Sequence, residues 1–175
     1  MDSAILNAIG LACGVHSMEW AEVVDNLLLK NLPFKIELDK FGKLLMSPAS
    51  NSHGRFQGRI AGALWQRQPE GEVITECSIQ TSEGVKVADV AWASASFIAE
   101  FGYATPYPKA PELCVEIVPP SNSKQEITEK VDLYLAKGAQ EVWVVYEDKR
   151  LEVFTHIGQI AESQFDPGIR GKIFR

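Results

Sequence analysis

The sequence predicts an α/β (α+β) fold in which a mixed β-sheet is flanked by helices. Its central part alternates apolar runs in the order strand, strand, strand, helix, strand, strand. Residues 112–146 are a strand–helix–strand segment, the arrangement that joins two parallel strands by a crossover. The 175 residues are 46% hydrophobic and 23% charged, which is the composition of a globular protein. We therefore expect one domain over residues 1–175, with residues 1–16 as a loosely ordered segment.

The N-terminal third predicts a helix and a hairpin. Residues 1–15 are apolar like a signal peptide, but Asp2 stands where a signal carries a basic residue, so we expect a short helix or a frayed segment. Residues 17–30 predict an amphipathic helix, because their large apolar residues share one face: Trp20, Val23, Val24, Leu27 and Leu28. Residues 34–38 and 43–46 flank a turn at 39–42 and predict a β-hairpin.

A second helix is expected after the turn and cap at residues 47–51. Its apolar side carries Phe56, Ile60 and Leu64, and a second stripe consists of glycines, Gly54, Gly58 and Gly62. Three glycines lower helix propensity, so we expect this stripe to lie close against a sheet. A close helix–helix contact is the alternative.

The remaining elements follow from apolar runs and their boundaries. Residues 73–80 and 85–92 predict two strands around a turn at 81–84, and residues 94–110 predict an irregular segment with a short helix. Residues 112–118 predict a strand that ends at two prolines. Ser123 and Glu126 form a capping-box pair for a helix to Lys137, which Gly138 ends. Residues 141–146 and 151–156 predict two further strands, joined by a turn.

Charge and cysteine content restrict the classes of function. The net charge is −6 and the pI is about 5.1, which excludes a generic basic nucleic-acid coat protein. Cys13, Cys77 and Cys114 are odd in number and widely spaced, so we expect reduced, mostly buried thiols in a cytoplasmic protein. No apolar run reaches the roughly 18 residues of a membrane span.

Two acids lie inside strands that are otherwise apolar, Asp89 in residues 85–92 and Glu116 in residues 112–118. A carboxylate there is costly unless it is paired, hydrogen-bonded or bound to a metal. Either acid alone is explained by a solvated sheet face or a buried salt bridge. Two acids on neighbouring strands, each near a strand end, favour a shared site, where a divalent cation would relieve their repulsion. Mg²⁺ (or Mn²⁺) suits a site with one or two carboxylates.

Lysines near these acids are the next candidates. Lys130 borders the inner face of its helix, defined by Ile127, Val131 and Tyr134, and it either snorkels to water or points across the sheet end toward Glu116. Lys86 and Lys124 compete for the same role. We find no nucleophile elbow, phosphate-binding P-loop or dinucleotide-binding glycine motif.

Four blocks in this order carry a resemblance to a known family: VADVAW (87–92), PELCVEIVPPSNS (111–123), EKVDLY (129–134) and GAQEVWVV (138–145). Upstream, IEL (36–38), MSP (46–48) and His53 match the opening hairpin and next helix. The sequence resembles the Uma family of restriction-endonuclease-like proteins, which has the PD-(D/E)XK nuclease fold. The resemblance spans residues 17–156 and implies a mixed sheet of four or five strands with flanking helices.

The resemblance also implies roles. Asp89 and Glu116 match the motif acids that bind the metal, with the Ile117 carbonyl as a further ligand, and Glu37 and His53 match accessory site residues. Without the resemblance, Glu37 is better explained as a solvent-facing strand acid and His53 as a cap or surface residue. The position two after Glu116, where the motif lysine normally stands, is Val118. In the family this lysine lies on the following helix, which points to Lys130.

A second departure from the family is Ala88, which replaces the usual proline before the motif Asp. The resemblance implies an Mg²⁺-dependent endonuclease that hydrolyses DNA phosphodiester bonds, with Asp89, Glu116 and Lys130 as catalytic residues, and a homodimer is plausible for cutting both strands of a duplex. Two alternatives remain open. One is an inactive nuclease-fold binding module, and the other is a metal-dependent hydrolase of a small phosphorylated or nucleotide substrate.

Overall fold

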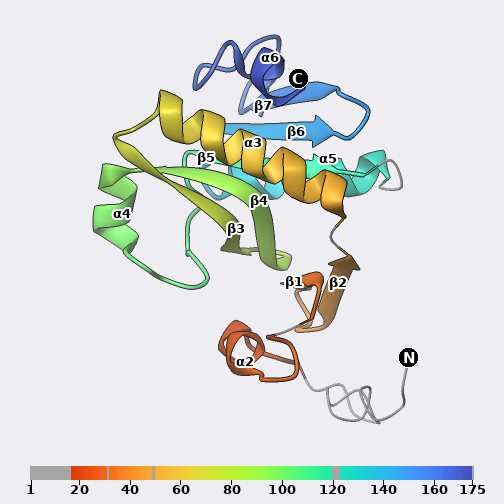
Figure 1. The fold of residues 1–175 in the computed structure, drawn as a ribbon. Helices are drawn as coiled ribbons and strands as arrows, with labels where there is room; N and C mark the ends of the chain where they lie inside the picture. Colours follow the sequence, from red (N-terminus) through yellow and green to blue (C-terminus); the bar gives the residue numbers. More distant parts are fainter. Residues whose placement is uncertain (1–16, 31, 49, 120–122, 175) are drawn as a thin grey trace.

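A six-stranded mixed sheet forms the centre of the molecule in the computed structural model, which describes residues 17–30, 32–48, 50–119 and 123–174 (Figure 1). The sheet order follows the chain, and only β5 and β6 are parallel. Its strands are β3 (Gly71–Thr81), β4 (Gly84–Ser94), β5 (Leu113–Val118), β6 (Glu141–Tyr146), β7 (Leu151–Thr155) and β8 (Gly158–Ile160). The expected segment 1–16, with Cys13, lies outside the described residues.

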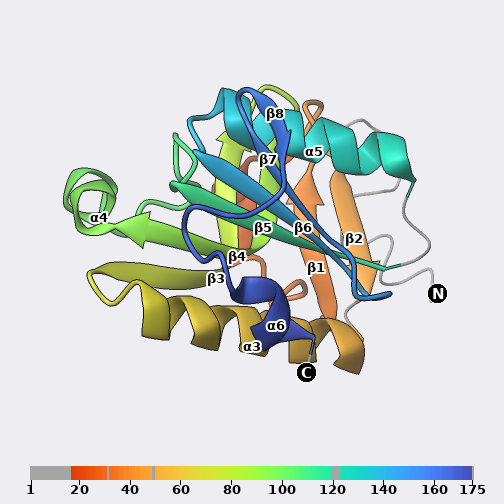
Figure 2. The ribbon, with the colours of Figure 1, turned by 90° about the horizontal axis from the view of Figure 1, so that it is seen from above.

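Helices cover both faces of this sheet (Figure 2). The core beneath α3 (Asn51–Arg67) and α6 (Ile169–Ile173) includes Ile60, Leu64 and Trp143. The opposite core lies beneath α5 (Lys124–Ala136) and α4 (Ala95–Phe101), and it includes Tyr134. The mixed α/β fold class is therefore confirmed.

The crossover helix α5 begins and ends where the sequence predicts. The Ser123 hydroxyl accepts the Glu126 N–H, and the Glu126 carboxylate accepts the Ser123 N–H, so both halves of the capping box are present. Gly138 follows the helix with a φ of 103°, which glycine adopts without steric cost. This compact crossover places α5 against β6, close enough to β5 for Tyr134 to donate a hydrogen bond to Glu116.

The glycine stripe of α3 is not a packing surface, so both readings of it were wrong. A Cβ atom added at Gly54, Gly58 or Gly62 would meet nothing within 4 Å. The opposite side of α3 packs on the sheet instead, with Ile60 and Leu64 fully buried. Burial of large aliphatic side chains orients the helix, and the glycines face outward.

The N-terminal helix is much shorter than the apolar pattern predicts. Helix α2 covers only Trp20–Asp25, because the Asn26 side chain accepts the Leu28 N–H in a local turn that competes with helical hydrogen bonding. Leu27 and Leu28 are consequently exposed rather than buried.

The predicted hairpin is present and forms a sheet of its own, β1 (Phe34–Leu38) paired with β2 (Leu44–Pro48). The Asp39 carboxylate shapes its turn by accepting the N–H groups of Phe41 and Lys43. Glu37 of β1 accepts the Val87 N–H of β4 at 2.9 Å, which ties the hairpin to the main sheet.

The C-terminal elements β8 and α6 had no counterpart in the sequence-based expectation. With β8 the main sheet has six strands, one more than the family resemblance implied at most. The buried Glu141 carboxylate fixes the segment after β8, because it accepts hydrogen bonds from Ser163 Oγ and the Gln164 N–H.

Cys77 and Cys114 are free and buried, as expected. None of the helices in the described part of the chain has the length and apolar character needed to span a bilayer.

Candidate active site

A cavity of about 280 Å³ opens between the hairpin, the N-terminal end of α3, and strands β4 and β5. Its wall includes Lys35, His53, Asp89, Glu116 and Lys130. Four of these are residues that the sequence singled out. The fifth, Lys35, was not considered. Glu37 lies directly behind Lys130, whose ammonium is 2.8 Å from Glu37 Oε1.

Asp89 lies in the middle of β4 rather than near its end, and it is fully buried. The alternation of the strand breaks there, since Ala88 and Ala91 both belong to the core under α5. The pairing of β4 with β5 also stops at Val90–Val115. In place of the next rung, Asp89 Oδ2 accepts the Ile117 N–H at 2.6 Å. A carboxylate thus replaces a backbone carbonyl where two central strands separate.

Glu116 points from β5 toward α5. Its Oε1 accepts the Tyr134 hydroxyl at 2.6 Å, and its Oε2 lies 3.3 Å from the ammonium groups of both Lys35 and Lys130. Lys130 therefore points toward Glu116, as the helical spacing suggested. Val118, at the usual position of the motif lysine, is buried in the core.

Lys35 links the two acids. Its ammonium is 2.6 Å from Asp89 Oδ1 and 3.3 Å from Glu116 Oε2. The two lysines and the three carboxylates of Glu37, Asp89 and Glu116 leave one negative charge when His53 is neutral. The repulsion between Asp89 and Glu116 is therefore already relieved by protein cations.

Burial and these cations push the pKa values of the two acids apart. Burial acts to raise the pKa of Asp89, but Lys35 and His53 outweigh it and lower that pKa to about 2. Burial dominates at Glu116 and raises its pKa despite Lys130 and Lys35. For Glu37 burial is outweighed by Lys130, and its pKa is lowered. Buried acids with divergent pKa values are typical of functional sites.

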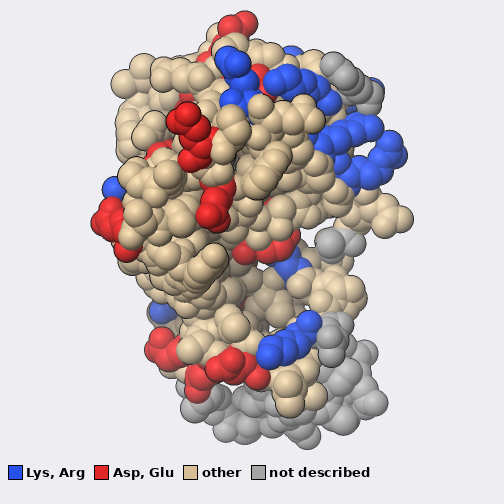
Figure 3. All heavy atoms as spheres, turned by 60° about the vertical axis from the view of Figure 1, so that its left-hand side comes forward, with Lys and Arg blue, Asp and Glu red and all other residues tan. Residues whose placement is uncertain are grey.

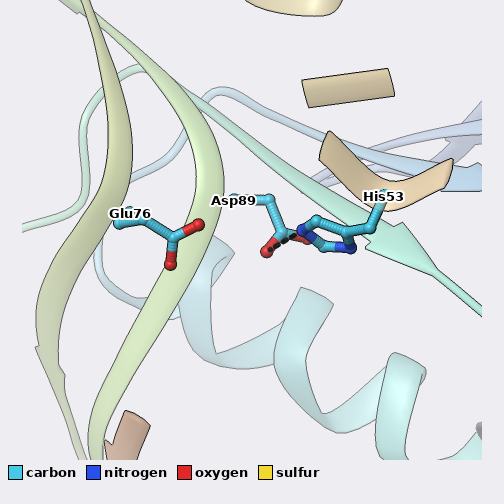
Figure 4. Close-up of side chains that lie close together, drawn as sticks. All are labelled: His53, Glu76 and Asp89. Atoms are coloured by element: carbon cyan, nitrogen blue, oxygen red, sulfur yellow. Dashed lines mark ion pairs between the residues drawn. The ribbon is translucent and has the colours of Figure 1, made fainter. Parts of the chain in front are cut away.

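His53 lies in the first turn of α3, where its N–H donates to the capping Ser50. Its Nε2 is 3.3 Å from Asp89 Oδ1, and this contact raises the pKa of His53. Glu76, on β3, is exposed and has a φ of 54° opposite Asp89. Figure 4 shows the three side chains, whose ligand atoms lie within 4.8 Å of one another. They are close enough to hold a metal ion.

Of the three candidate lysines, only Lys130 lines the cavity with the two acids. Lys86 contacts the Leu38 carbonyl, and neither it nor Lys124 lines the cavity that contains Asp89. Glu37 is buried, so the reading as a solvent-facing acid was wrong.

Sequence reasoning missed Lys35, Tyr134 and Glu76 as neighbours of the acids. Lys35 carried a usable signal, because it lies two residues before Glu37 and shares a strand face with it. Glu76 carried no such signal in the sequence, because its position beside Asp89 depends on a local break in the alternation of β3, where its φ is 54°.

Comparisons with known proteins agree on the class of protein. The chain is similar in structure to a protein of Anabaena variabilis ATCC 29413 described as a "putative nuclease belonging to DUF820". The TM-score is 0.57 at 20% identity, covering 69% of this chain and 71% of that one, which establishes likeness of fold. No curated protein matches the chain.

A family model described as "Putative restriction endonuclease", Uma2, matches residues 21–170. This range contains the residues that line the cavity and most of the described structure. The family and the nuclease-like fold support a nuclease at this coarse level. The chain therefore belongs to the Uma2 family.

Proposed function

We propose that the protein is an Mg²⁺- or Mn²⁺-dependent endonuclease that hydrolyses phosphodiester bonds of DNA. The observation that carries the proposal is the pair of buried acids on adjacent strands, Asp89 and Glu116. Both contact the ammonium of Lys35 at the wall of an open cavity. Family membership makes DNA the expected substrate.

The donor set fits a divalent ion. Asp89 Oδ1 and Glu116 Oε2 converge closely enough for a single ammonium to contact both, and hard carboxylate oxygens are the ligands that Mg²⁺ prefers. Asp89 and Glu116 would hold the ion, and Glu76 and His53 offer further ligands beside Asp89. Bound there, the ion would supply Lewis-acid polarisation of the phosphate.

The remaining side chains orient the ligands and balance charge. The Ile117 N–H donates to one oxygen of Asp89, and the Tyr134 hydroxyl donates to one oxygen of Glu116. The second oxygen of each carboxylate is left toward the cavity. Lys130 is anchored by Glu37 and presents a positive charge that would stabilise negative charge developing on a phosphate.

A plasmid-cleavage assay tests the proposal. Supercoiled DNA is incubated with Mg²⁺ or Mn²⁺ and the wild type, Asp89→Asn, Glu116→Gln or, as a control, Asp148→Asn, which changes an exposed acid in the β6–β7 turn. We expect cleavage by the wild type and the control, with at least a hundredfold loss in the two site variants, in keeping with the roles of such groups. Equal cleavage by all four proteins would refute the proposed site.

A groove beside the cavity favours a second candidate, a metal-dependent hydrolase of a small phosphorylated or nucleotide substrate. The groove, about 920 Å³, runs between the hairpin and α5 and is lined by six acids against Lys86 and Lys130: Glu37, Asp39, Glu83, Glu126, Glu129 and Asp132. These acids would repel a DNA backbone lying along it. On the face drawn in Figure 3, acidic and basic groups are interspersed, with the largest basic group at the upper right edge. Cleavage of nucleotides but not of plasmid would favour this candidate.

A single domain, a cytoplasmic location and a homodimer remain predictions. Size-exclusion chromatography with light scattering tests the dimer directly, since a dimer would double the monomer mass of 19.3 kDa.

A further inference from the structure

We propose that Lys35 is a built-in counter-cation, which occupies the position between Asp89 and Glu116 and must withdraw when a divalent ion binds there. This inference rests on the proposed function. It goes beyond it by assigning to a residue of the hairpin control over metal affinity.

The geometry of β1 places the ammonium in this position. Lys35 and Glu37 alternate with Phe34 and Ile36, so both charged side chains leave the same face of the strand. Only 12% of the Lys35 side chain is exposed, and its ammonium contacts one oxygen of each acid, Asp89 Oδ1 at 2.6 Å and Glu116 Oε2 at 3.3 Å. The lysine thus lies where one cation serves two carboxylates.

A divalent ion cannot share this position with the ammonium. An ion bound to the same two oxygens would lie next to the ammonium, and like charges repel strongly in a poorly solvated site. The ammonium can move without any change in the backbone, because the side chain of Lys35 already borders the cavity of about 280 Å³. In that cavity it would face a bound phosphate beside Lys130.

Lys130 provides the matched control. It carries the same charge and also contacts Glu116 Oε2 at 3.3 Å, but its second partner is Glu37 rather than Asp89. Replacing either lysine with methionine removes one positive charge from the same cluster. Only Lys35→Met vacates the position between the two metal-binding acids.

The first experiment measures Mn²⁺ binding without substrate, by isothermal titration calorimetry and by the electron paramagnetic resonance of free Mn²⁺. If the Lys35 ammonium occupies the position between the acids in about nine molecules of ten, only about one in ten can bind the ion. Lys35→Met should then bind Mn²⁺ about tenfold more tightly than the wild type. Lys130→Met should gain clearly less, and Asp89→Asn should lose binding. Equal tightening in both lysine variants, or none in Lys35→Met, would overturn the competition.

The second experiment uses the wild type and is independent of whether Lys35→Met folds. Amine-selective labelling followed by mass spectrometry should modify Lys35 several-fold faster with saturating Mn²⁺ than without it. Lys40, which is about half exposed and paired with Glu83, should be unaffected. An unchanged Lys35 rate with Mn²⁺ bound would refute the withdrawal.

The outcomes distinguish this inference from the proposed function. If Mn²⁺ binding is lost in Asp89→Asn but its affinity is unchanged in Lys35→Met, the role of Lys35 is overturned and the metal site stands. No Mn²⁺ binding by the wild type or by either lysine variant counts against both.

Discussion

Removal of one hydroxyl group, in Tyr134→Phe, tests whether Glu116 is held as a buried, charge-assisted acceptor. The Tyr134 hydroxyl donates to Glu116 Oε1 at 2.6 Å, and its side chain is fully buried. Phenylalanine keeps the ring and its packing, so the change removes the hydrogen bond and leaves a buried oxygen without its donor. A hydrogen bond to a charged group contributes about 1.5–3 kcal/mol, so we expect the free energy of unfolding to fall by about 2 kcal/mol.

The matched control is Tyr107→Phe. The Tyr107 hydroxyl donates at 2.8 Å to the Gly102 carbonyl, a neutral acceptor, so its loss should cost only about 1 kcal/mol. With a urea m-value of about 2 kcal/mol/M, the unfolding midpoints should drop by about 1 M and about 0.5 M respectively. Burial raises the pKa of Glu116 above its ordinary value, so this acid takes up its proton earlier than a free glutamate as the pH falls, and the difference between the two variants should shrink in acid. A cost for Tyr134→Phe no larger than for Tyr107→Phe at pH 8 would refute the reasoning.

Three further predictions concern stability. Alanine at Gly54, Gly58 and Gly62 meets no neighbour, so the triple variant should gain about 2 kcal/mol from helix propensity, and an unchanged or lower melting temperature would contradict this. Lys35 and His53 overcome burial and hold the pKa of Asp89 at about 2, against 3.8 for a free Asp. Asp89 should therefore contribute about 2 kcal/mol to the stability that is lost as pH falls from about 4 to 2, and Asp89→Asn should show a correspondingly shallower slope in acid titrations of the urea midpoint. Glu141→Gln should cost about 2–3 kcal/mol in urea unfolding, because the amide cannot accept all three hydrogen bonds that this carboxylate receives, and a wild-type midpoint would exclude the anchoring role.

The sequence was most informative where local chemistry and burial agree. The capping box at Ser123, the glycine at 138 and the apolar run of β5 led to the correct crossover. The failures have a common cause, since they depend on contacts that periodicity does not describe. Leu27 and Leu28 fit a helical face, but the Asn26 side chain turns the chain before them. The α3 glycines resemble a packing stripe, yet larger side chains decide which side is buried.

The same distinction applies to the site. Asp89 and Glu116 could be found because acids stand out in apolar strands, and their shared cavity agrees with that choice. The partners that set their properties come from distant segments: Lys35 from the hairpin and Tyr134 from α5. A metal was inferred from the repulsion between the two acids, but Lys35 already relieves that repulsion. Pairings of this kind depend on tertiary structure, which a single sequence does not specify locally.

The attachment of the hairpin has a consequence for how the molecule opens. Strands β1 and β2 form a separate sheet, so peptide hydrogen bonding alone would let them detach as an independent unit. Detachment would, however, separate Lys35 from Asp89 and remove Glu37, the acceptor of the Val87 N–H. The Asp89 carboxylate and the Val87 N–H would then lose these partners in the interior. The hairpin and the central sheet should therefore behave as one foldon, and the amides of β1 should exchange with deuterium at rates close to those of β4 rather than those of a fraying edge.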